Sequence, residues 1–126
     1  MIQPPVPSIL PREVADAIDP SVATDPSTRP LVVDVREPNE FAQARIDGVV
    51  LMPISQFVAR HAELPKDRPL LMLCAAGSRS TSATMYLLQA GWTDVRNITG
   101  GMMAWQAAGL PVRSGPPDPA EGDLPG

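Results

Sequence analysis

The chain has 126 residues, with 44% hydrophobic and 19% charged side chains, and this composition predicts one soluble domain with an ordinary core. Its net charge of −4 argues against general binding to nucleic acid or to an anionic membrane, because the sequence-independent attraction would have the wrong sign. With one cysteine and one histidine, the chain offers no internal disulfide, dithiol pair or His/Cys metal cluster, so we expect neither a metal nor a cofactor.

No apolar stretch reaches the ~20 residues of a membrane span. The first residues lack the basic and apolar regions of a signal peptide. We therefore expect a cytoplasmic protein.

The first quarter of the chain is predicted to hold one strand and one helix. Residues 1–7 are Pro-rich and form an N-terminal extension. Residues 8–10 can add a short edge strand, and Pro11 then suits the first turn of a helix over 11–19. Residues 20–30 are rich in Pro, Ser and Thr and predict a loop.

Two buried strands and two helices are predicted next. Residues 31–35 form a continuous apolar run typical of a strand covered on both faces, although Asp34 within it requires hydrogen-bond partners. A helix begins at Pro38, a second strand spans 49–52, and a second helix begins at Ile54 and ends before Pro65.

The second half repeats the alternation of strand and helix. Residues 70–73 predict the central strand, and a helical pattern follows from Arg79. Residues 94–98 predict the last strand, and a helix follows Gly100–Gly101. Residues 113–126, rich in Pro and Gly, predict a mobile tail. The alternation predicts an α/β fold with a central, mostly parallel sheet flanked by helices, in which ligands bind beyond the carboxyl ends of the strands.

The only cysteine, Cys74, lies at that end of the central strand. A strand that passes through a tight loop into a helix N-terminus presents backbone N–H groups and a positive dipole end to an anion. Such a site, with an arginine nearby, can lower a thiol pKa from about 8.5 into the range of roughly 3.5 to 7.5. The sequence therefore predicts a nucleophilic thiolate at Cys74.

Three stretches of the chain resemble a single-domain rhodanese, a sulfurtransferase. They are Asp34-Val35-Arg36-Glu37 with Glu40-Phe41, the loop Cys74-Ala75-Ala76-Gly77-Ser78-Arg79-Ser80, and Gly100-Gly101-Met102-Met103-Ala104-Trp105 with Gly109-Leu110-Pro111-Val112. The resemblance covers residues 8–112 and departs from the family pattern once, where Ala44-Arg45-Ile46 stands for Gly-His-Ile.

The resemblance implies a Cys74 persulfide cradled by the backbone amides of residues 75–80. It implies transfer of a sulfane sulfur from a small anionic donor such as thiosulfate to a thiophilic acceptor, which is cyanide in the usual test and a protein or small thiol otherwise. The sequence does not name the physiological donor or acceptor.

Each polar residue near this loop has a catalytic and a structural interpretation. Arg79 is expected to stabilise the bound anion by fork-like donation. Ser78 and Ser80 either cap the helix or donate to the persulfide, and Gly77 supplies a positive φ or room for sulfur. We expect Asp34, Arg36 and Glu40 to form a structural polar cluster, and we expect Arg45 to be a solvated surface charge.

Two other functions remain open on the same residues. Phosphatase or arsenate-reductase chemistry also uses a cysteine in an amide-lined loop, but related phosphatases carry one residue more than the four between Cys74 and Arg79. A non-catalytic interaction module is the third hypothesis, although inactive relatives usually lack the cysteine or the arginine.

Overall fold

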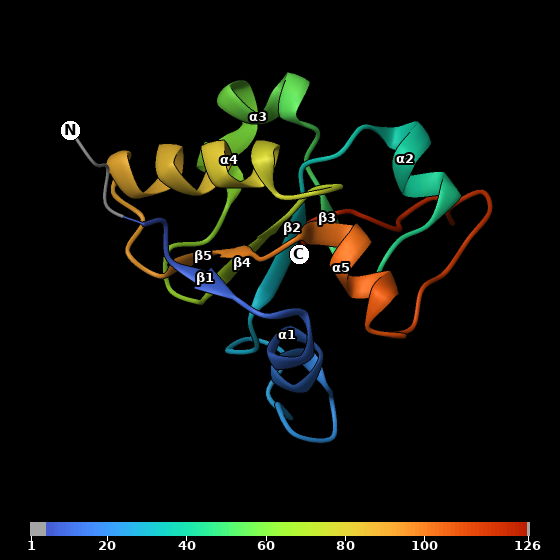
Figure 1. Ribbon diagram of the computed structural model, residues 1–126. Helices are drawn as coiled ribbons and strands as arrows, with labels where there is room; N and C mark the ends of the chain where they lie inside the picture. The colour runs from blue at the N-terminus through green and yellow to red at the C-terminus, as the bar shows by residue number, and fades with distance from the viewer. Residues whose placement is uncertain (1–4, 126) are drawn as a thin grey trace.

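Five strands form one sheet in this computed structural model, which describes residues 5–125 (Figure 1). The strands are β1 (Ser8–Ile9), β2 (Leu31–Asp34), β3 (Val50–Leu51), β4 (Leu70–Leu73) and β5 (Val95–Ile98). Their order is β1-β5-β4-β2-β3 and every pair is parallel. The expected parallel sheet is confirmed, with β4 as its middle strand.

The helices cover both faces of the sheet. They are α1 (Pro11–Ile18), α2 (Pro38–Gln43), α3 (Ile54–Arg60), a short 3₁₀ turn η1 (His61–Glu63), α4 (Ser78–Gln89) and α5 (Gly101–Ala107). Side chains of β4 alternate between the faces: Leu70 and Met72 pack in one cluster with residues of α3 and α4, whereas Leu71 and Leu73 pack in the other with residues of α1, α2 and α5.

The buried carboxylate on β2 has the partners that its position requires. Arg36 donates from Nη2 to Asp34 Oδ2 at 2.8 Å and from its backbone N–H to Oδ1 at 3.0 Å, and both side chains are nearly inaccessible to solvent. Arg36 also donates to the Ala44 carbonyl at 2.7 Å. This pair therefore ties the end of β2 to the end of α2.

Arg45 is not the solvated surface charge that the sequence suggested. Its side chain is 2% exposed, forms an ion pair with Glu121 and donates to the Gly115 carbonyl at 2.8 Å. Its backbone exchanges two hydrogen bonds with Arg113, at 2.9 and 2.8 Å. The expectation was wrong because the carboxylate partner lies 76 residues further along the chain.

Residues 113–125 also differ from the expected mobile tail. The Leu51 N–H of edge strand β3 donates to the Gly122 carbonyl at 2.8 Å, and Leu124 packs against the hydrophobic core. Composition indicated only that this segment cannot build a core of its own. The sheet edge and Arg45 supply the partners that it lacks locally.

Replacing Glu121 with Gln is expected to lower the melting temperature at neutral pH, because the buried Arg45 loses its counter-charge. Donation by Arg45 holds the pKa of Glu121 below its ordinary value. A lowered carboxylate pKa contributes stability above the unfolded pKa of about 4.3, and this contribution is lost as pH falls through the folded pKa. The difference in melting temperature between wild type and Glu121→Gln should therefore disappear at acidic pH. Thermal melts across pH, with the exposed Asp118→Asn as control, measure this, and an equal difference at every pH would contradict it.

Candidate active site

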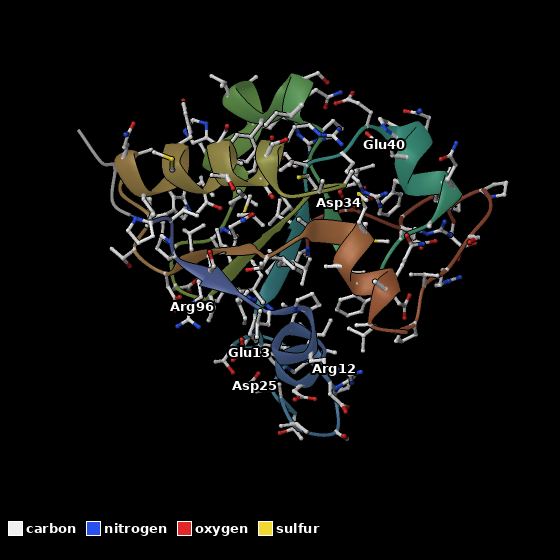
Figure 2. All side chains as sticks on the ribbon, in the orientation of Figure 1. Arg12, Glu13, Asp25, Asp34, Glu40 and Arg96 are labelled. Atoms are coloured by element: carbon white, nitrogen blue, oxygen red, sulfur yellow. The ribbon has the colours of Figure 1, made fainter. Side chains whose placement is uncertain are left out.

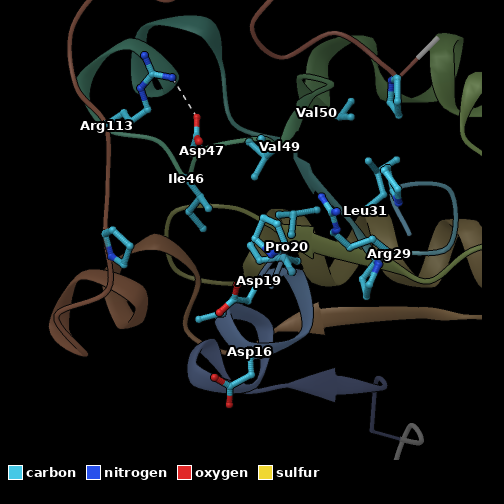
Figure 3. A pocket seen from close by; sticks show the side chains of 18 of the residues that line it. Asp16, Asp19, Pro20, Arg29, Leu31, Ile46, Asp47, Val49, Val50 and Arg113 are labelled. Atoms are coloured by element: carbon cyan, nitrogen blue, oxygen red, sulfur yellow. Dashed lines mark hydrogen bonds and ion pairs between the residues drawn. The ribbon is translucent and has the colours of Figure 1, made fainter. Parts of the chain in front are cut away.

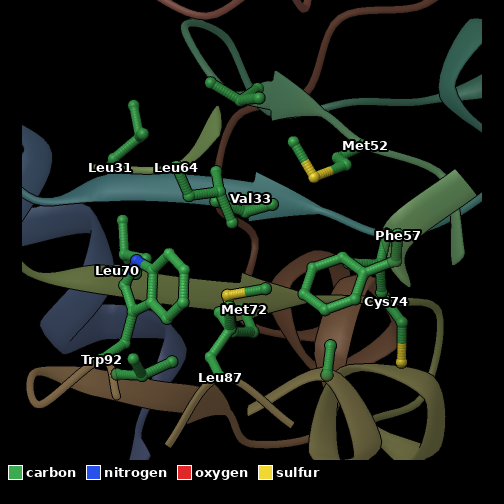
Figure 4. Packing of buried hydrophobic residues seen from close by; sticks show 14 residues of the cluster. Leu31, Val33, Met52, Phe57, Leu64, Leu70, Met72, Cys74, Leu87 and Trp92 are labelled. Carbon is green, nitrogen blue, oxygen red and sulfur yellow. The ribbon is translucent and has the colours of Figure 1, made fainter. Parts of the chain in front are cut away.

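Cys74 lies where β4 ends and the chain turns toward α4. Figure 4 shows it at the end of the hydrophobic cluster that contains Phe57 and Met72. The turn is completed by Gly77, whose φ of 115° is one that glycine adopts without strain, as expected. Gly77 is also the N-cap of α4, with no side-chain capping bond, so the capping role considered for Ser78 and Ser80 was wrong. Ser78 instead faces solvent.

Cys74 is 1% exposed, and its sulfur lies within hydrogen-bond distance of two donors. The Gly77 N–H donates to Sγ at 3.0 Å and the Ser80 hydroxyl donates to it at 3.2 Å. Burial raises the pKa of the thiol, but the hydroxyl and N–H of Ser80 and the N–H groups of Gly77 and Ala76 lower it by more. The net pKa lies below the ordinary value, so the loop favours the thiolate.

Ser80 is held by a residue that sequence reasoning did not select. Its fully buried hydroxyl lies 2.5 Å from Asn97 Oδ1 and 3.2 Å from both the Gly77 carbonyl oxygen and the Cys74 sulfur, so its single proton is shared among these three acceptors. Asn97 belongs to β5, beside the central strand, and is buried. Asn97 is a polar residue inside a predicted strand, as Asp34 is in β2, and this signal could have identified it from the sequence.

Arg79 is placed beside the loop, but its fork is already occupied. It donates from Nη1 and Nη2 to the two carboxylate oxygens of Glu40, at 2.7 and 2.9 Å. This hydrogen bonding lowers the pKa of Glu40 to about 2 and raises that of Arg79. Glu40 therefore pairs with the loop arginine, and only Asp34 and Arg36 form the expected structural pair. Figure 2 labels Glu40 on α2 and Asp34 at the end of β2.

The first turn of α5 holds the loop from its other side. The Met102 N–H donates to the Cys74 carbonyl at 2.9 Å and the Met103 N–H donates to the Ala75 carbonyl at 3.0 Å. A Cβ on Gly101 would meet the Cys74 carbonyl oxygen and lie 2.8 Å from that of Ala75. Gly101, which the sequence indicated only as part of a turn, therefore allows α5 to approach the loop backbone. The carbonyls of Cys74 and Ala75 therefore accept from α5, whereas the Gly77 N–H donates to the sulfur.

Two cavities lie at different ends of the sheet. One of about 290 Å³ adjoins the loop at Ala75. The other, of about 730 Å³, lies at the strand starts Leu31 and Val50, and Figure 3 shows it beside α1 and the Asp47–Arg113 ion pair. The larger cavity is therefore at the opposite end of the strands from Cys74. Over residues 5–125, no group of three acidic, His or Cys side chains is suited to a metal, and no helix is long and apolar enough to cross a membrane.

Removing the Ser80 hydroxyl is expected to raise the Cys74 pKa, because a buried thiolate loses a donor. A hydrogen bond to a charged group contributes about 1.5–3 kcal/mol, so the Ser80→Ala thiol should alkylate roughly tenfold or more slowly at neutral pH. Iodoacetamide rates measured across pH give the pKa directly. Ser82→Ala removes an exposed hydroxyl from the same helix and should leave the profile unchanged. A Ser80→Ala profile that matches wild type would show that this hydroxyl does not stabilise the thiolate.

Comparisons with known proteins identify the family and the fold of this chain. The family model described as a rhodanese-like domain matches residues 12–108. A sulfurtransferase of Allochromatium vinosum is 42% identical over 82 residues, which are 65% of this chain and 77% of the relative. The thiosulfate sulfurtransferase GlpE of Shewanella oneidensis is 34% identical over 77 residues, covering 61% of this chain and 76% of that protein. A rhodanese-related protein of Thermoplasma volcanium superimposes with a TM-score of 0.74 at 29% identity, over 85% of this chain and 97% of its own.

Proposed function

This chain belongs to the rhodanese-like domain family, and we propose that it moves a sulfane sulfur from a donor to an acceptor through a persulfide on Cys74. Its relatives named as sulfurtransferases support sulfurtransferase activity in general. The observation that carries the finer proposal is the buried Cys74 sulfur, which receives hydrogen bonds from Gly77 and Ser80 and has a lowered pKa.

In the first half-reaction, the Cys74 thiolate attacks the outer sulfur of a donor such as thiosulfate. A new S–S bond forms, the donor's S–S bond breaks, and its electron pair leaves with sulfite. No general base is needed, because the reacting form is the thiolate that the loop favours. The persulfide keeps the negative charge of the thiolate, one atom further from the strand.

The backbone amides of the loop residues Ala75, Ala76, Gly77, Ser78, Arg79 and Ser80 stabilise this charge. The Ser80 hydroxyl adds one donor, whereas the Arg79 guanidinium is paired with Glu40. Because these donors are in place before the reaction, they lower the barrier without reorganisation. The small side chains of Ala75 and Ala76 leave space for one extra sulfur atom.

In the second half-reaction, a thiophilic acceptor attacks the outer sulfur and restores the Cys74 thiolate. Cyanide serves in the assay, and a small thiol or a protein thiol serves in the cell. The kinetics are double-displacement, and no metal or cofactor takes part. We place the activity in the cytoplasm, on a small anionic donor, with no nucleic-acid or membrane partner.

Intact-mass spectrometry tests the proposal. Protein incubated with thiosulfate should gain about 32 Da, the mass of one sulfur, and cyanide should remove it. If no adduct forms but Cys74 alkylates rapidly at neutral pH, the thiolate serves another electrophile, and arsenate or aryl phosphates become the substrates to test. If no adduct forms and Cys74 alkylates slowly at neutral pH, the proposal fails and the chain is better interpreted as a non-catalytic interaction module.

A further inference from the structure

Two arginines beside the Cys74 loop are already neutralised by carboxylates. Arg79 is bidentate with Glu40, at 2.7 and 2.9 Å, and Arg36 is paired with the buried Asp34. The Arg79–Glu40 pair is only partly buried, with 31% and 27% of the two side chains exposed. This pair therefore lies where a reaction partner can meet it.

These two ion pairs give an incoming anion no net positive charge beyond the backbone dipoles of the loop. Because Arg79 holds the pKa of Glu40 at about 2, Glu40 stays ionised at every pH at which the protein is handled. The chain as a whole carries a charge of −4, which adds a weak repulsion.

The adjoining cavity of about 290 Å³ has the same uncharged character. Besides the two paired residues Arg36 and Glu40, its walls include side-chain amides, thioethers and the loop itself, from Gln43, Gln106, Met102, Met103 and Ala75. Met103 is 66% exposed at its rim. Amides and thioethers suit an uncharged, amide-bearing molecule and do not attract a carboxylate or a sulfonate.

We propose that Glu40 sets the charge selectivity of the site: by pairing with Arg79, it makes Cys74 favour donors and acceptors whose sulfur sits on an uncharged, amide-bearing carrier. This inference rests on the proposed function and refines it. Thiosulfate remains a usable donor, but the site favours uncharged donors over it. Anions must compete with Glu40 for the Arg79 fork, whereas uncharged partners have no such competitor.

Two alkylating agents that differ only in charge test the proposal on the resting protein. Iodoacetate is an anion and iodoacetamide is its uncharged amide, and Cys74 is the only cysteine that either can modify. The ratio of their rate constants cancels any change in the thiolate fraction. Loss of the Glu40 charge, which leaves the Arg79 guanidinium without its counter-charge, should raise the iodoacetate-to-iodoacetamide ratio in Glu40→Gln roughly five- to tenfold at low ionic strength.

Glu37→Gln is the matched control, since it removes the same charge from the same segment. The Glu37 carboxylate accepts from Ser55 at 2.9 Å and does not contact Arg79, so its ratio should change less than about twofold. Gln at position 40 can still accept the Glu37 N–H bond that Glu40 accepts at 3.1 Å. Helix α2 therefore keeps its first turn in the test variant.

The steady-state counterpart is a lower KM for thiosulfate in Glu40→Gln with little change in kcat. An unchanged alkylation ratio, or equal slowing of both reagents, would show that Glu40 only positions Arg79 and would overturn the proposal. The alkylation ratio needs no sulfur transfer. It therefore remains informative if thiosulfate leaves no adduct, in which case the proposed function fails and the charge selectivity is judged separately.

Discussion

Cys74→Ser is expected to abolish the thiosulfate-dependent mass adduct and to reduce thiocyanate formation from thiosulfate and cyanide by at least about a thousandfold. Serine has nearly the volume of cysteine, and Gly77 and Ser80 can still donate to its oxygen. The hydroxyl, however, is not ionised near neutral pH and cannot hold a sulfane sulfur. The loss of activity would therefore result from replacing the Cys74 sulfur atom with oxygen.

Thermal melts of the same variant provide the control for folding, since a folded Cys74→Ser protein separates lost chemistry from lost structure. Ser82→Ala serves as an active comparison variant on α4. An adduct of about 32 Da on Cys74→Ser would contradict the assignment, because no other thiol exists in the chain to carry it.

Gly101→Ala is expected to have the largest effect on stability among single-methyl additions near the loop. The new Cβ would collide with the carbonyls of Cys74 and Ala75, and the residue's φ of 57° disfavours any side chain. The conformational cost is about 1–2 kcal/mol and overpacking adds about 1–3 kcal/mol, so the free energy of unfolding should fall by roughly 2–5 kcal/mol.

Gly109→Ala is a control that isolates the collision. Gly109 has a comparable φ of 73°, but a Cβ added there would have nothing within 4 Å, so only the conformational cost of about 1–2 kcal/mol applies. Urea unfolding of both variants measures the difference. Gly101→Ala should also raise the Cys74 pKa, because the loop must shift. Equal losses of stability in the two variants would contradict the close approach of α5.

The sequence predicted the features whose causes are local. The apolar runs at β2 and β4 need no distant partner to be recognised, and the Cys74 loop is defined by adjacent residues. The direction of the strands and the position of Cys74 at a carboxyl end follow from the alternation of strands with helices. These parts of the fold could therefore be expected before the structure was known.

Long-range side-chain partners could not be predicted in the same way. Glu40 and Arg79 are 39 residues apart, and Arg45 and Glu121 are 76 apart. Neither spacing has a helical or strand period, so no pattern links the members of a pair. The sequence therefore indicated no carboxylate partner for Arg79, and it wrongly predicted that Arg45 is exposed to solvent. Asn97 was missed for the same reason, since Ser80 lies on another element.

The closure of β3 by the C-terminal segment has a consequence for self-association. An edge strand with free N–H groups is a template on which a second chain can extend the sheet and begin to aggregate. Here Gly122 takes the Leu51 N–H, and the segment carries Pro116, Pro117, Pro119 and Pro125, which have no N–H to continue a ladder. Residues 113–125 thus end the sheet on this side and keep neighbouring molecules from adding a sixth strand there.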